Sequence, residues 1–125
     1  MSKSILSETS WWPVNKLFTR KYGIDAALII ADLSSKQEYF KGRKMLDKNG
    51  YFFNEKKDIE RDTSISPYRQ DKAFKILTDI KVLDTEIRKG IPPKRYYRVN
   101  INRLNKLVLS LYELDGKNKK DTVNN

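Results

Sequence analysis

Lysine and arginine residues gather in the second half of the sequence, in a pattern that suits binding to phosphate groups. Residues 65–103 contain ten cations and four carboxylates, and residues 88–98 contain five cations and no carboxylate. A cation beside a nucleic-acid phosphate releases a condensed counterion, and this release drives binding. The first chemistry that these residue types indicate is therefore ionic contact with a polyanion.

The residue types that most catalytic and metal sites need are missing. The sequence has no histidine and no cysteine, which excludes disulfides, thiol nucleophiles, Cys/His zinc sites and histidine acid–base catalysis. Asp58 and Glu60 have no third acid that the sequence places beside them, and the five glycines are too scattered for a phosphate-binding loop. We therefore expect no enzyme activity, no metal and no cofactor.

The overall charge indicates the same class of partner. The 125 residues carry 26 Lys and Arg against 16 Asp and Glu, a formal net charge of +10. This excess favours nucleic acid over an anionic membrane surface, and the alternative is that it only keeps the protein soluble. The longest apolar stretch, residues 26–31, is too short to span a bilayer, and the first residues carry no apolar signal region. We expect a cytoplasmic protein with no membrane partner.

Periodicity and capping residues predict the elements that position these cations. A helix is expected over residues 11–22, where Gly23 ends it. A buried helix follows over residues 25–33, with Asp25 as its N-cap. A turn at residues 48–50 then leads into a short strand at residues 51–53.

Two further helices flank a turn at residues 62–65. The first is short, covers residues 55–61 and takes Asn54 as its cap; the second covers residues 67–81 and begins with Ser66 as N-cap and Pro67. Ser64 occupies a turn position that favours glycine if φ is positive. The inner stripe of the second helix is Ala73, Phe74, Leu77 and Ile80.

Alternation of apolar and polar residues then predicts a β-hairpin with a loop over residues 89–95. Matching the apolar faces aligns three pairs, Leu83 with Ile101, Thr85 with Val99, and Ile87 with Tyr97. This register sets Glu86 opposite Arg98 as an ion pair, and Arg88 is expected to stack on Tyr96. A last helix is expected over residues 103–114, before a polar, disordered tail at residues 115–125.

This order of elements predicts an α+β fold, mostly α, of the winged helix-turn-helix type with a C-terminal helix. Residues 1–10 form an N-terminal arm, residues 11–114 the domain, and residues 115–125 the tail. In such a fold the helix over residues 67–81 enters the major groove of double-stranded DNA. The loop over residues 89–95 is the wing, which contacts the DNA backbone or the minor groove.

Eight residues on those two elements are the candidate DNA contacts. They are Tyr68, Arg69, Lys72, Lys75, Arg88, Lys89, Lys94 and Arg95. Arg69 is in the first turn of its helix, where a cation opposes the helix dipole unless an anion or a guanine edge meets it. Gln70 either contacts adenine or is turned inward.

A homodimer is also expected. Trp11 and Trp12 are predicted to lie in the core or in a dimer interface. With the apolar stripe of the last helix they offer more apolar surface than one small core needs. That stripe consists of Leu104, Leu107, Val108 and Leu111.

Four segments also resemble the N-terminal winged helix of replication proteins from Gram-positive phages and plasmids, the phage replisome-organiser and DnaD-like group. The segments are residues 22–28, 49–52, 58–66 and 89–100, and the likeness covers residues 11–107. The resemblance implies DNA binding in replication initiation or its control, and self-association through the N-terminal segment. DnaD-like proteins usually carry a further C-terminal domain for single-stranded DNA and helicase loading. This chain ends before one, so we expect a stand-alone regulator or an accessory binder.

Two other functions fit the same residues. One is a transcriptional regulator on the same fold, which also binds duplex DNA. The other is a protein-interaction winged helix that inhibits a host protein, with its basic face against an acidic partner.

Overall fold

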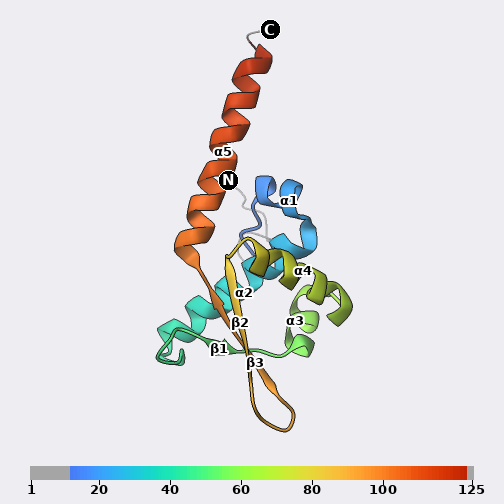
Figure 1. Cartoon of the computed structure of the whole chain (residues 1–125), viewed down its shortest axis with the longest axis vertical. Helices are drawn as coiled ribbons and strands as arrows, with labels where there is room; N and C mark the ends of the chain where they lie inside the picture. The colour runs from blue at the N-terminus through green and yellow to red at the C-terminus, as the bar shows by residue number, and fades with distance from the viewer. Residues whose placement is uncertain (1–11, 124–125) are drawn as a thin grey trace, which may run out of the picture.

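The computed structural model describes residues 12–123 of the chain, and Trp11 and the expected arm at residues 1–10 lie outside the described residues. The predicted α+β, mostly helical class is confirmed, because the described part has five helices and one antiparallel sheet of three strands in the order β1-β3-β2 (Figure 1). The helices are α1 (Lys16–Tyr22), α2 (Ile24–Gly42), α3 (Lys56–Thr63), α4 (Pro67–Asp79) and α5 (Ile101–Val123). The strands are β1 (Phe52–Phe53), β2 (Leu83–Arg88) and β3 (Lys94–Val99).

A single glycine joins α1 to α2. Gly23 has a φ of +93°, which an L side chain rarely adopts, and its N–H donates to the Thr19 carbonyl at 2.9 Å, so it ends α1 as predicted. The prediction of Asp25 as N-cap is wrong, because Gly23 itself occupies the cap position and Asp25 lies in the first turn of α2. α1 also starts later than predicted, at Lys16, because the side chain of Asn15 caps it by accepting from the Phe18 N–H at 2.9 Å.

The central helix is α2, as predicted. It packs against α1, α3, α4 and β3, and seven of its residues between Ala26 and Leu33 are buried. It continues to Gly42, past the predicted end at Leu33. The amide of Gln37 contributes to this extension, since it accepts from the N–H of Val99 at 2.7 Å and donates to the Val99 carbonyl at 3.1 Å. The second half of α2 is thereby bonded to the end of β3.

Lys36 connects α2 to α3. Its Nζ lies 2.8 Å from Asp32 and 3.0 Å from Asp62, and it donates to the Asn54 side chain at 3.3 Å. Burial alone would raise the pKa of Asp62, but hydrogen bonds from Arg61 and Lys36 outweigh it and lower the pKa. Asn54 is therefore not the N-cap of α3 that we predicted. Glu55 occupies the cap position, and the side-chain oxygen of Asn54 accepts a hydrogen bond from Lys36.

The turn between α3 and α4 has the expected backbone. Ser64 has a φ of +63°, in the left-handed region, and the Ser66 hydroxyl accepts from the Arg69 N–H at 3.4 Å, which caps α4 at Pro67 as predicted. α4 ends at Asp79, two residues before the predicted end, because Lys81 turns the backbone with a φ of +64°.

The hairpin register differs from the prediction by two residues. The aligned pairs are Leu83 with Val99, Thr85 with Tyr97, and Ile87 with Arg95. A shift of two keeps every side chain on its predicted face, so the hydrophobic pattern alone does not distinguish the two registers. The difference comes from the ends of the hairpin: its loop covers residues 89–93, and Asn100 caps α5 by accepting from the Arg103 N–H at 3.0 Å, which removes Ile101 from β3.

The last helix is longer than predicted. α5 continues through Val123, so the disordered tail predicted from residue 115 is wrong for residues 115–123. Its first turns are anchored, since Leu111 is buried and Leu104, Leu107 and Val108 pack against the core. Adding residues to an anchored helix avoids the cost of nucleation, which allows a polar segment to extend it. Figure 1 shows α5 and the β2–β3 loop at opposite ends of the molecule.

Candidate nucleic-acid interface

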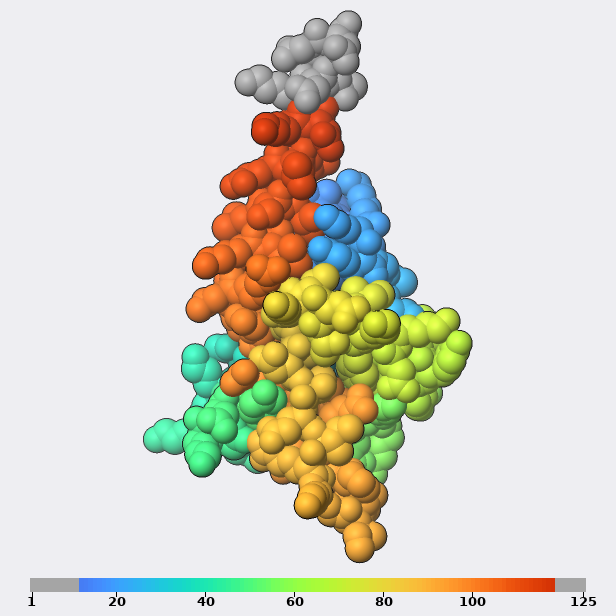
Figure 2. Space-filling model, in the orientation of Figure 1, coloured from blue at the N-terminus to red at the C-terminus, as the bar shows by residue number. Residues whose placement is uncertain are grey.

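Helix α4 and the β2–β3 hairpin share one face of the protein. Figure 2 shows the outer surface of α4, in yellow, directly above β2, with α3 to one side. The core positions this face: Phe74 of α4 is 4% exposed, and its ring centroid lies 5.5 Å from that of Tyr97 in β3. The two elements that sequence analysis selected for DNA contact are therefore held side by side.

The outward side of α4 carries three of the predicted residues. Tyr68, Lys72 and Lys75 are all exposed, Tyr68 by 70%. The Lys72 ammonium lies over the Tyr68 ring, 4.7 Å from its centroid. Lys75 makes an exposed ion pair with Asp79 at 3.4 Å, a contact that one turn of the same helix provides.

Arg69 lies at the side of α4 that faces α2, and it has a carboxylate partner. Its Nε donates to Asp25 at 2.8 Å, and its Nη2 donates to the other oxygen of the same carboxylate. These hydrogen bonds raise the pKa of Arg69. The anion that meets Arg69 is therefore Asp25 of the same protein, because the first turn of α2 lies beside the first turn of α4.

Gln70 is turned inward, so the alternative of an adenine contact is excluded in this conformation. The side chain is 0% exposed, and its amide donates to the carbonyls of Lys56 at 3.0 Å and Ile65 at 2.8 Å. These bonds join α4 to the start of α3 and to the turn. Gln70 therefore sets how α4 sits on α3 and has a structural role.

Three cations of the hairpin have no carboxylate partner among the described residues. Lys89 is the first residue of the loop, and its side chain makes no ion pair or hydrogen bond with the described residues. Lys94 and Arg95 are in β3 and not in the loop as predicted, because β3 starts at Lys94. The Lys94 ammonium lies 5.3 Å from the Phe53 ring centroid, and the Arg95 guanidinium lies 5.6 Å from that of Phe74. Arg95 thus lies between the hairpin and α4.

Arg88 belongs to an internal network. It stacks on Tyr96, 3.7 Å from the ring centroid, as predicted, and it donates to Asp47 and, at 3.3 Å, to Glu86. The bond from Arg88, together with backbone N–H groups of Tyr51 and Asn49, lowers the pKa of Asp47 to about 2. Because this network already neutralises its charge, Arg88 is a weaker candidate for phosphate contact than Lys89.

Arg98 pairs with a different acid from the one predicted. It donates to Asp84 at 2.9 Å and 3.1 Å, and not to Glu86, because the register shift sets Asp84 opposite Arg98. Sequence analysis also missed the ion pair of Asp25 with Arg69 and that of Lys36 with Asp62, which join residues far apart in the chain. One indication of such contacts was present in the sequence, namely that polar side chains occur within helices that are otherwise buried.

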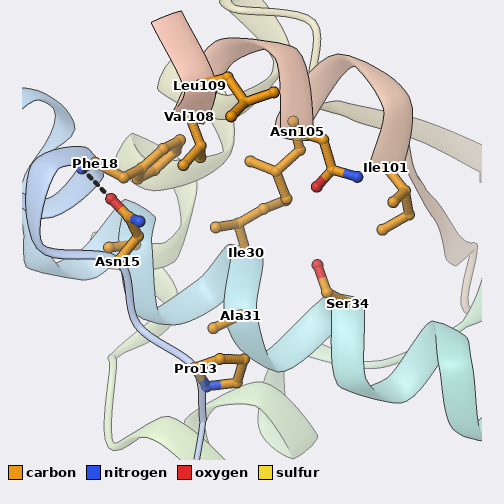
Figure 3. Close-up of a pocket in the computed structure, with 12 residues that line it drawn as sticks. Pro13, Asn15, Phe18, Ile30, Ala31, Ser34, Ile101, Asn105, Val108 and Leu109 are labelled. Carbon is orange, nitrogen blue, oxygen red and sulfur yellow. Dashed lines mark hydrogen bonds between the residues drawn. The ribbon is translucent and has the colours of Figure 1, made fainter. Parts of the chain in front are cut away.

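An apolar groove lies on another part of the surface, between α1, α2 and α5. Its volume is about 550 Å³, and Figure 3 shows Phe18, Ile30, Ile101, Val108 and Leu109 around it. Trp12 is half-buried near the same region, with its indole N–H donating to Asp32 at 3.1 Å. Its indole is therefore anchored within its own chain.

Other kinds of site find no support among residues 12–123. No three potential metal-ligating side chains gather in this part of the chain. Within the same residues, none of the helices has the length and apolar character needed to cross a bilayer. Comparisons with protein-family models, curated proteins and solved structures found no match.

Proposed function

We propose that this protein is a winged helix-turn-helix protein that binds double-stranded DNA without catalysis. Helix α4 lies in the major groove, led by its N-terminal residues, and the β2–β3 loop is the wing. The observation that carries the proposal is the set of cations without carboxylate partners on the α4–hairpin face. They are Lys72, Lys89, Lys94 and Arg95.

We propose different tasks for the residues of this interface, based on the contacts that each one makes. Lys89 and Lys94 contact phosphates, since neither is used in an ion pair with the described residues. Tyr68 and Lys72 lie near the start of α4, where side chains reach base edges, and both are exposed without a carboxylate partner among residues 12–123. Arg69 joins them only if it leaves Asp25.

The biological role that we propose is replication initiation, or its control, in a phage or plasmid. It rests on the resemblance of the turn, the loop and the strand after it to the winged helices of such replication proteins. Regulation of transcription uses the same DNA contacts. Selecting bound duplexes from a random pool, followed by footprinting, distinguishes the two: repeats at an origin favour replication, and overlap with a promoter favours transcription.

The direct test is the salt dependence of binding to a fluorescein-labelled random duplex. Four cations without carboxylate partners among the described residues predict that log affinity falls with log salt at a slope of about −4. Lys89→Ala should make the slope less negative by about one. Lys117→Ala, in the last part of α5, removes the same charge away from the hairpin and should leave the slope unchanged.

Two outcomes would contradict the proposal. One is no binding to duplex at low salt, which favours the protein-interaction alternative. The other is binding whose slope responds equally to Lys89→Ala and Lys117→Ala, which would mean that net charge matters and the α4–hairpin face does not.

We also propose that two copies associate through α5. Ile101, Leu109 and Tyr112 are 39%, 63% and 51% exposed, lie on one side of α5, and two of them adjoin the groove in Figure 3. Contiguous exposed apolar surface of this kind marks an interaction site. A second α5 is a self-complementary occupant for a two-fold contact. Such a dimer would bind half-sites about one DNA turn apart.

A further inference from the structure

The tip of the β2–β3 loop presents apolar side chains to solvent. Ile91 is 105% exposed, whereas no other large hydrophobic side chain of the described residues exceeds 70%. Pro92 and Pro93 are exposed as well, so three consecutive apolar residues face water. A single exposed apolar residue is common on protein surfaces and needs no explanation. A run of three exposed apolar residues costs free energy and is kept where it has a function.

The loop has a restricted shape. The proline rings fix φ at residues 92 and 93, which lowers the entropy that the tip loses on binding. A Cβ at position 90 would lie 3.1 Å from the Pro92 carbonyl oxygen, so Gly90 allows the chain to pass close to itself. The two strands beneath the loop pair as far as Arg88 and Lys94. Ile91 is therefore presented at the end of an ordered hairpin.

Cations lie on both sides of this tip. Lys89 precedes it and Lys94 begins the strand that follows it, and the sequence has no carboxylate from residue 87 to residue 112. An apolar point between two cations matches the minor groove of DNA, which is a narrow slot with a row of phosphates along each edge. An apolar protein pocket has no such paired anions. An anionic phospholipid surface has phosphates above an apolar interior, and the vesicle measurement below distinguishes it from DNA.

We propose that Ile91, supported by Pro92, is a wedge that enters the minor groove and partly unstacks a base step. Isoleucine and proline are among the side chains that minor-groove proteins insert in this way, and the insertion bends the duplex. The wedge rests on the proposed function, since it needs the wing to lie against DNA. It adds an activity that phosphate contacts lack, namely deformation of the duplex.

The wedge predicts a preference that originates in the minor groove. The guanine 2-amino group projects into that groove, and inosine lacks it while keeping the same major-groove edge. Wild-type protein should bind an alternating inosine–cytosine duplex about 3- to 10-fold more tightly than the guanine–cytosine duplex. Ile91→Ala should reduce this ratio of the two affinities to the value of a protein that binds duplex without a wedge. Ile91→Leu should keep the wild-type ratio.

Unstacking is measured separately. An alternating inosine–cytosine duplex that contains pyrrolocytosine should brighten on binding of wild-type protein, because the fluorescence of this base rises when it unstacks and pyrimidine–purine steps deform easily. The added ring of pyrrolocytosine lies in the major groove, so the minor groove that the wedge enters is unchanged. Ile91→Ala should lose this rise while keeping the salt slope, since no charge changes. Met45→Ala is the matched control, because Met45 is a loop side chain that is 60% exposed but lies outside the wing.

The outcomes separate the wedge from the proposed function. If Ile91→Ala equals wild type in both assays while both bind DNA, the wedge is wrong and duplex binding stands. If wild-type protein binds no duplex at low salt, the proposed function fails and the wedge fails with it. If wild-type protein binds anionic phospholipid vesicles and not duplex, and Ile91→Ala loses the vesicles, the tip contacts membranes and the wedge is overturned.

Discussion

The carboxylate of Asp25 holds the guanidinium of Arg69 across the contact between α2 and α4. Arg69 donates to this carboxylate through Nε, at 2.8 Å, and through Nη2. The side chain of Asp25 is 28% exposed and that of Arg69 is 51% exposed. The pair lies at the edge of the face that we propose for DNA. A phosphate therefore has to compete with Asp25 for Arg69, and Asp25 reduces the affinity that Arg69 can contribute.

Asp25→Asn should strengthen duplex binding. It removes a negative charge beside the interface and frees Arg69, so we expect a gain of about 3- to 10-fold at low salt and a salt slope more negative by about one. Arg69→Ala should have a small effect in the wild type and should abolish the gain in Asp25→Asn. The measurement is a double-mutant cycle of affinities on one duplex.

Glu113→Gln on α5 is the control, because it changes net charge equally and frees no residue of the interface. Equal gains from Glu113→Gln and Asp25→Asn would show that only net charge matters. A loss of about 1–3 kcal/mol from Arg69→Ala alone would show instead that Arg69 leaves Asp25 and contacts a base.

Phe74→Ala should destabilise the fold by about 3–5 kcal/mol, because it removes a buried aromatic ring from the junction of α4 and the sheet. Phe74 is 4% exposed and its ring lies 5.5 Å from that of Tyr97. Denaturant unfolding measures the change. Lys72→Ala, on the exposed side of the same helix, should stay within about 0.5 kcal/mol of wild type, and a comparable loss there would argue against this core.

Acid should weaken the contact between the hairpin and the loop after α2. The pKa of Asp47 is lowered to about 2, below the ordinary value of about 3.9 in an unfolded chain. A lowered folded-state pKa stabilises the protein above the unfolded value, and this contribution is lost as pH falls through about 2. Melting temperatures of wild type and Asp47→Asn should therefore differ at about pH 6 and converge toward about pH 2. A difference that grows on acidification would contradict this assignment.

Leu109→Asp should shift the protein toward monomer if α5 forms the dimer contact. Leu109 is 63% exposed and borders the apolar groove, so a carboxylate there would be buried without a partner in a dimer. Sedimentation velocity at several protein concentrations measures the change. Ser110→Asp adds the same charge at the next exposed position and should leave the wild-type distribution largely intact. A wild-type protein that remains monomeric with and without DNA would rule out this dimer.

Interactions between residues close together in the chain were enough to predict several helix ends and core residues. Gly23 ends α1, Ser66 and Pro67 start α4, and Phe74 lies in the core, because turn geometry, capping and periodicity act within a few residues. The positions of the cations along the chain follow directly from the sequence. So does the absence of cysteine and histidine chemistry, because those residue types do not occur.

The tertiary structure decided which of those cations are available. Whether Arg69 meets Asp25, or Arg98 meets Asp84, depends on contacts between elements that are distant in the chain. Alternation of side chains determines the face of a strand but leaves a shift of two residues open, so the cap at Asn100 and the loop at residues 89–93 set the register. Gln70 had two plausible orientations on one helix, and only the packing of α4 against α3 turned it inward.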